Sequence, residues 1–90
     1  MKDSIDYVMI GKRIKDKRIE NNMTQEELAY AVELSPTYLS KLENGRVNVS
    51  LETLGVISAY HDIDFGYLFS GTLTIDDSYL DNRLIEITKN

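Results

Sequence analysis

Two helix-start signals, at positions 24 and 35, constrain this fold more than any other feature of the sequence. The segment Thr24-Gln25-Glu26-Glu27 is a capping box: the Thr24 hydroxyl accepts from the Glu27 amide, and the Glu27 carboxylate accepts from the Thr24 amide. Ser35-Pro36 is the second signal, because serine is a favoured N-cap and proline suits the first helical position. Only a short helix and a tight turn fit between the two, which predicts a helix-turn-helix geometry.

Similar caps and stops along the rest of the chain predict an all-α fold of five short helices. We expect helices over about 7–20, 25–32 and 36–43, a fourth that Ser50 caps, and a fifth over 65–69 that Asp64 caps. Strand signals are weak, and Leu73-Thr74-Ile75 is the only alternation of note. Residues 76–88 are expected to form an extra helix in the C-terminal tail, with Leu80, Leu84 and Ile87 on one face.

The composition excludes several classes of function. The chain has 90 residues, no cysteine and one histidine, His61, so we expect one domain with no disulfide, metal site or cofactor. No nucleophile–base pair or phosphate loop is evident, which indicates that the chain is not an enzyme. No apolar run approaches the roughly 18 residues that a membrane helix needs. We therefore expect a soluble cytoplasmic protein without a membrane partner.

The predicted third helix has two distinct faces. Leu39 and Leu42 point inward, while the opposite face is small and polar and carries one cation. This face could enter a DNA major groove about 12 Å wide, or it could be an ordinary solvated surface. Periodicity alone leaves both interpretations open. The residues of this face are Pro36, Thr37, Ser40, Lys41 and Asn44.

A resemblance favours the first interpretation. Met23-Thr24-Gln25-Glu26-Glu27-Leu28-Ala29, followed by Leu34-Ser35-Pro36-Thr37-Tyr38-Leu39-Ser40-Lys41-Leu42-Glu43-Asn44-Gly45, closely resembles the lambda-repressor/Cro-like (XRE-type) helix-turn-helix family. The similarity covers about residues 8–70. It implies a compact five-helix DNA-binding domain over residues 1–71 and places the tail, 72–90, outside the family pattern. The tail is expected to serve dimerisation; the alternatives are a helix packed on its own domain or one frayed in solution.

The resemblance also assigns roles to individual residues. It implies DNA base contacts for Pro36, Thr37, Ser40 and Lys41. It implies DNA backbone contacts for Lys17, Gln25, Tyr38, Asn44 and Arg46, with Gln25 often packed against the first side chains of the recognition helix. Simpler interpretations stay open: Gln25 as a helix-start residue, Tyr38 as a packing residue, Lys41 as a solvated lysine and Asn44 as a helix cap.

Four further positions bear on the structure of the domain. By resemblance, Arg18 and Glu43 form an internal ion pair, the alternative being two unpaired surface charges. Glu33 stands where the family often has glycine, so either it adopts a left-handed conformation at a cost of about 1 kcal/mol or the turn is built differently. His61 stands where a buried leucine is common, and we expect it to be half-buried and hydrogen-bonded at a helix end rather than a pH-sensitive or ligand-related site.

The function implied is that of a sequence-specific transcriptional regulator of double-stranded DNA. We expect a repressor that acts as a homodimer on a pseudo-palindromic operator with half-sites about 34 Å apart. The alternative is an antitoxin or adaptor module that binds a protein partner through the tail. The operator sequence and a continuation of the natural chain past Asn90 stay open.

The net charge of −5 is compatible with a DNA partner because of its distribution. Residues 1–49 carry 8 cations and 8 acids, whereas residues 50–90 carry 2 cations and 7 acids, which gives 2 − 7 = −5. The acidic part would face away from the duplex. This distribution predicts weak non-specific binding and a dependence on dimerisation for affinity.

Overall fold

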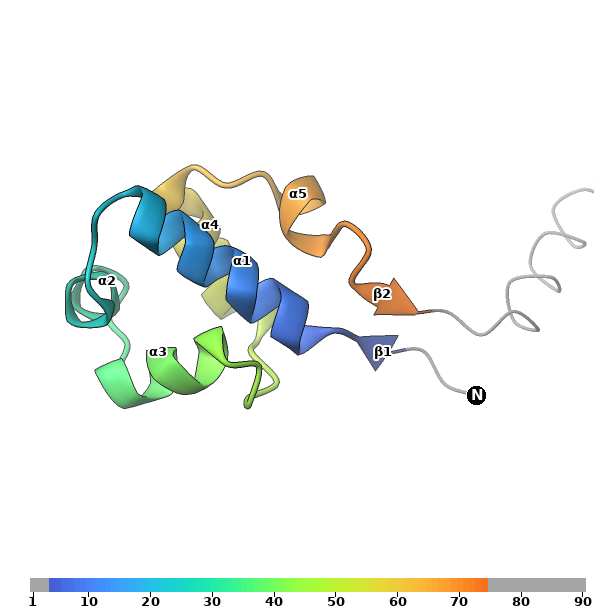
Figure 1. Ribbon diagram of the computed structural model, residues 1–90, viewed down its shortest axis with the longest axis horizontal. Coiled ribbons are helices and arrows are strands. Elements are labelled where there is room, and N and C mark those ends of the chain that lie inside the picture. The colour runs from blue at the N-terminus through green and yellow to red at the C-terminus, as the bar shows by residue number, and fades with distance from the viewer. Residues whose placement is uncertain (1–3, 75–90) are drawn as a thin grey trace, which may run out of the picture.

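The computed structural model describes residues 4–74 and contains five helices, as predicted (Figure 1). Their bounds are α1 (Tyr7–Glu20), α2 (Gln25–Ala31), α3 (Pro36–Glu43), α4 (Leu51–His61) and α5 (Phe65–Phe69). In Figure 1, α1 crosses the middle of the molecule with α3 beside it, and α2 lies at the opposite end from residues 4–5 and 73–74. Residues 75–90 lie outside the described residues, so the expected tail helix over 76–88 and the division into 1–71 and 72–90 stay predictions.

Each predicted N-cap is present. The capping box of α2 is complete: the Glu27 amide donates to Thr24 Oγ1 at 3.0 Å, and the Thr24 amide donates to Glu27 Oε1 at 2.8 Å. Ser35, Ser50 and Asp64 each accept a hydrogen bond from a backbone amide three residues later. These bonds satisfy amides that would otherwise have no partner in the helix, so the local sequence fixes where each helix begins.

Helices α1 to α4 all end through one backbone device. A residue with positive φ follows each helix: it is the second residue after α1, α2 and α3 (Asn22, Glu33 and Gly45) and the first after α4 (Asp62). Its amide and the next amide donate back to carbonyls of the last helical turn, which is the Schellman arrangement. Glu33 has φ 60°, so the first alternative, a left-handed glutamate, is confirmed. This conformation destabilises the turn by about 1 kcal/mol relative to glycine.

The core lies between α1 and the other helices, and α1 packs most extensively on α3. Gly11 permits this approach, because a Cβ there would collide with the Leu42 carbonyl oxygen and lie 2.8 Å from that of Glu43. The buried side chains form a single cluster. Its members are Ile10, Ile14, Leu28, Ala29, Val32, Leu39, Leu42, Val49, Leu54, Ile57, Ile63 and Leu68.

A short antiparallel pair of strands is the one feature that the all-α expectation lacked. β1 (Ser4–Ile5) pairs with β2 (Leu73–Thr74), with Ser4 opposite Thr74 and Ile5 opposite Leu73. The Asp6 amide also donates to the Thr72 carbonyl oxygen at 2.6 Å. The weak alternation at Leu73-Thr74-Ile75 does cover β2, but two-residue strands are too short for such a pattern to predict a sheet. The pairing holds the two ends of the described chain together beyond α1 and α5.

Substitution of Gly11 by alanine should destabilise the domain by about 1–3 kcal/mol, because the added methyl group meets backbone rather than a movable side chain. Urea unfolding followed by circular dichroism measures the change. Lys12→Ala is the matched control, since the Lys12 side chain is 72% exposed, and it should stay within about 0.5 kcal/mol of wild type. Equal stability of the two variants would contradict the packing argument.

Candidate nucleic-acid interface

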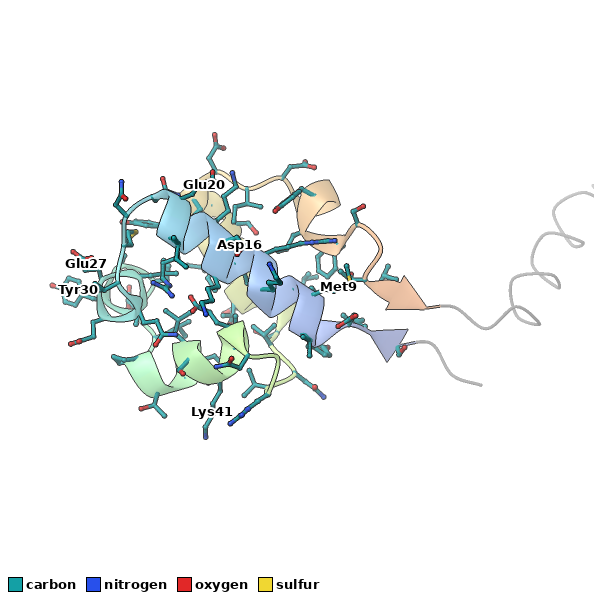
Figure 2. All side chains as sticks on the ribbon, in the orientation of Figure 1. Met9, Asp16, Glu20, Glu27, Tyr30 and Lys41 are labelled. Atoms are coloured by element: carbon teal, nitrogen blue, oxygen red, sulfur yellow. The ribbon has the colours of Figure 1, made fainter. Side chains whose placement is uncertain are left out.

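Helix α3 presents the polar face that the sequence predicts. Leu39 and Leu42 are buried beneath it, and Ser40 is half-buried. Figure 2 shows Lys41 extending from α3 on the side away from α1. The helix is therefore anchored by its apolar side and offers its polar side to a partner. The exposed residues of this face are Pro36, Thr37, Lys41 and Asn44.

The end of α3 and the following loop hold two of the predicted backbone-contact residues, Asn44 and Arg46, and a third, Tyr38, lies in the first turn of α3. Asn44 caps the helix, and its Nδ2 donates to the Ser40 carbonyl oxygen at 2.8 Å. Arg46 is exposed in the loop, where the Schellman bonds around Gly45 fix the backbone. Tyr38 is half-buried and packs against the core cluster. Asn44 thus serves as a cap, and one amide N–H remains for a further partner.

The structure brings Arg18 and Glu43 together in a buried bidentate ion pair. Arg18 Nε donates to Glu43 Oε2 at 2.7 Å, and Arg18 Nη2 donates to Glu43 Oε1 at 3.0 Å. The two side chains are 9% and 1% exposed. Arg18 Nη1 also donates to the Met23 carbonyl oxygen at 2.7 Å, in the turn before α2. A pair of this geometry satisfies both charges, whereas loss of one partner would strand the other at a cost of about 3–5 kcal/mol.

Gln25 joins the same cluster from the first position of α2. Its Nε2 donates to Glu43 Oε1 at 2.9 Å, so this oxygen accepts from both Gln25 and Arg18. The Gln25 side chain is half-buried. The bond reaches the last turn of α3, whereas the resemblance led us to expect a neighbour in its first turn. No spacing rule predicts it, because 18 residues separate the two side chains in sequence.

The cations of α1 are largely engaged with protein groups. Lys17, a predicted backbone-contact residue, is 31% exposed and pairs with Glu20 at 3.2 Å. Lys12 pairs with Asp16 at the same distance. A phosphate contact from Lys17 therefore requires it to exchange Glu20 for the phosphate. Exposed pairs of this kind are weak, so the exchange costs little.

Arg13 has a structural role that the sequence did not indicate. Its Nη1 donates to the carbonyl oxygens of Tyr67, Leu68 and Ser70 at 3.0, 3.2 and 2.6 Å. Its guanidinium also lies 5.6 Å from the centre of the Tyr67 ring. A cation at this point neutralises the partial negative charge at the end of α5 and holds α5 against α1. In the sequence, Arg13 is indistinguishable from the neighbouring surface lysines.

His61, at the end of α4, is half-buried and hydrogen-bonded, as expected. Asn21 Nδ2 donates to His61 Nδ1 at 3.4 Å, while His61 Nε2 is buried and has no partner among the described residues. Burial lowers the pKa of His61 below 6.5; the positive charge of Lys17 acts in the same direction, and Glu43 opposes it. The folded state therefore resists protonation of this ring.

Residues 4–74 lack two features that are associated with other functions. No group of three or more His, Cys, Asp or Glu side chains within residues 4–74 could hold a metal ion. In the same part of the chain no helix is long and apolar enough to cross a membrane.

Comparisons with known proteins agree with the geometry. A family model described as helix-turn-helix matches residues 14–68. The ImmF control region 10 kDa protein of Bacillus phage phi105 is 42% identical over 64 residues, which cover 71% of each chain. The restriction-modification controller protein C.AhdI of Aeromonas hydrophila superposes with a TM-score of 0.66 at 33% identity, over 71% of this chain and 97% of that one. The controller protein C.Esp1396I, a tetramer in complex with its natural 35 base-pair operator, has a TM-score of 0.62 at 32% identity, over 70% and 83%.

The lowered pKa of His61 gives a pH-dependent stability. The unfolded chain binds a proton on this ring near pH 6.5 but the folded chain does so only at lower pH, so the free energy of unfolding falls as the pH drops through 6.5. His61→Leu removes this proton and the unpartnered buried Nε2. It should raise stability by about 1 kcal/mol at neutral pH and flatten the dependence between about pH 7 and 5.5. Urea unfolding across this range measures both slopes, and parallel slopes would refute the assignment.

Proposed function

Since the chain belongs to the lambda-repressor/Cro-like (XRE-type) helix-turn-helix family, we propose that it is a sequence-specific transcriptional regulator of double-stranded DNA. We propose further that it represses transcription and acts as a homodimer on a pseudo-palindromic operator. The observation that carries the proposal is the face of α3, whose polar side chains stand clear of the body while Leu39 and Leu42 are buried beneath them. A rigid helix of this kind can dock in a major groove.

Each polar residue then receives a chemical role. Thr37, Ser40 and Lys41 would hydrogen-bond to base edges in the major groove, and Pro36 could offer only an apolar contact, for example to a thymine methyl group. The contacts to phosphates would fix the register of the protein without reading sequence. We assign these contacts to Lys17, Gln25, Tyr38, Asn44 and Arg46.

The homodimer has a candidate surface within the described residues. Val56 and Tyr60 are 48% and 50% exposed and lie four residues apart on α4, so they share one face of that helix. Ala59, also exposed, lies between them. Burial of this apolar face against a second copy removes it from water and favours association. The tail is the second candidate for this role.

The alternative, an antitoxin or adaptor module whose main partner is a protein, is not favoured. The match to an operator-bound controller protein and the exposed face of α3 both support a nucleic-acid partner. The alternative predicts that duplex affinity would not depend on salt, whereas phosphate contacts make it fall as salt rises.

The docking model is tested with duplexes selected from a random pool. Lys41→Ala should weaken binding to the enriched sequence by about 1–3 kcal/mol and relax specificity at one base position. Arg46→Ala should instead weaken binding to all duplexes alike. It should also reduce the slope of log K against log salt concentration by about 1, because one phosphate contact is lost. Gel-shift titrations at several salt concentrations measure both. If neither variant loses affinity, α3 is not the reading helix.

The proposed dimer surface is tested by sedimentation velocity. Val56→Glu places a charge on the apolar face of α4, so it should convert the dimer to monomer and reduce operator affinity. Ile19→Glu is the matched control, because Ile19 is an aliphatic residue of similar exposure, 54%, on α1. If the Val56→Glu protein stays dimeric, the interface does not lie on this face of α4 but on another surface.

A further inference from the structure

We propose that Glu43 is a positioning residue for DNA binding: it holds the side-chain amide of Gln25 in one orientation, ready to meet a phosphate. The inference rests on the function proposed above and deepens it. It concerns a group that would not itself touch DNA, since Glu43 is 4% exposed.

The contacts place Glu43 where three helices meet. Its carboxylate, on the last residue of α3, accepts from Arg18 of α1 at 2.7 and 3.0 Å and from Gln25 of α2 at 2.9 Å. Arg18 also donates to the Met23 carbonyl oxygen just before α2. Glu43, which anchors the Gln25 amide, is therefore itself fixed by two hydrogen bonds from Arg18. Because Glu43 is the last residue of α3, this anchor moves with that helix.

Within residues 4–74, Glu43 is the one group that hydrogen-bonds to the Gln25 side chain. Thr24, the N-cap of α2, and Glu27 bond to each other's backbone amides in the capping box. Pro36, which opens α3, has no side-chain donor or acceptor. Glu43 is thus the group that fixes the amide, and one amide N–H and the carbonyl oxygen of Gln25 remain for other partners.

The charges make this arrangement compatible with a phosphate. An unpaired carboxylate behind Gln25 would repel DNA, but the bidentate contact with Arg18 neutralises Glu43. The side-chain amide of Gln25 can then bind the phosphate as a neutral hydrogen-bond donor. Holding it in advance spares the entropy of ordering a glutamine side chain on binding, which should be worth up to roughly tenfold in affinity.

A double-mutant cycle tests the coupling. The paired substitution Arg18→Met with Glu43→Met removes the anchor without stranding a charge, so the domain should stay folded. In the wild-type background, Gln25→Ala should weaken binding to the selected duplex roughly tenfold. In the Met/Met background the same change should cost about threefold or less. Equal costs in the two backgrounds would overturn the proposal.

Lys41→Ala is the matched control, because no described contact links Lys41 to Glu43. It should lower affinity by the same factor in both backgrounds, which shows that α3 still docks in the same way. If Lys41→Ala also loses its effect in the Met/Met background, the ion pair acts on the placement of α3 and not on Gln25, and the proposal fails.

A second measurement needs no variant and no DNA. Gln25 is the only glutamine of the chain, so its side-chain amide signal can be told from those of the asparagines in NMR spectra by its correlation with Cγ. The proposal requires ¹⁵N relaxation of this amide to give an order parameter close to the rigid value of about 0.85, and a value below about 0.6 would overturn it even if the Met/Met protein does not fold. If wild-type protein enriches no duplex from the random pool, the proposed function fails instead, whatever the order parameter.

Discussion

The buried contact between Arg18 and Glu43 ties together the three helices on which the interface depends. Arg18 comes from α1, Glu43 ends α3, and the second guanidinium edge reaches the Met23 carbonyl oxygen before α2. Buried charges are stable only when their hydrogen-bonding capacity is filled, so the pair is satisfied in one mutual placement of these helices. The position of α3 relative to α2, which defines the proposed DNA-reading surface, follows from that placement.

This contact requires the backbones of α1 and α3 to be unusually close. Gly11 supplies the space, since any side chain there would meet the carbonyl groups of Leu42 and Glu43. Gly45 acts at the same point: it closes α3 with φ 70°, and its missing Cβ makes room for the backbone of Val8. The polar pair and the glycines therefore depend on each other, because the carboxylate could not reach Arg18 from a more distant helix.

The features that the sequence predicted are those encoded over short distances. Thr24, Ser35 and Ser50 are caps that act within one turn, and they predict where α2, α3 and α4 begin. The features that it did not predict join side chains far apart in the chain. Arg13 bonds to the end of α5, and β1 pairs with β2 across most of the described chain, a pairing that the weak alternation at Leu73-Thr74-Ile75 could not predict. The pairing of Arg18 with Glu43 came from family resemblance, since spacing alone cannot select partners 25 residues apart.

The contacts that the cations of α1 make within the protein change how the charge of the chain affects DNA binding. Five cations of α1 look like a basic surface in the sequence, yet Arg13 and Arg18 bind internal groups, and Lys12 and Lys17 lie beside acids. The electrostatic attraction of the protein to DNA phosphates, which does not depend on DNA sequence, is thus smaller than a count of cations implies. In the proposed homodimer, affinity would then depend more on geometric fit in the groove and on two copies acting together. Side chains held in advance by the core therefore matter more here than they would in a strongly basic domain.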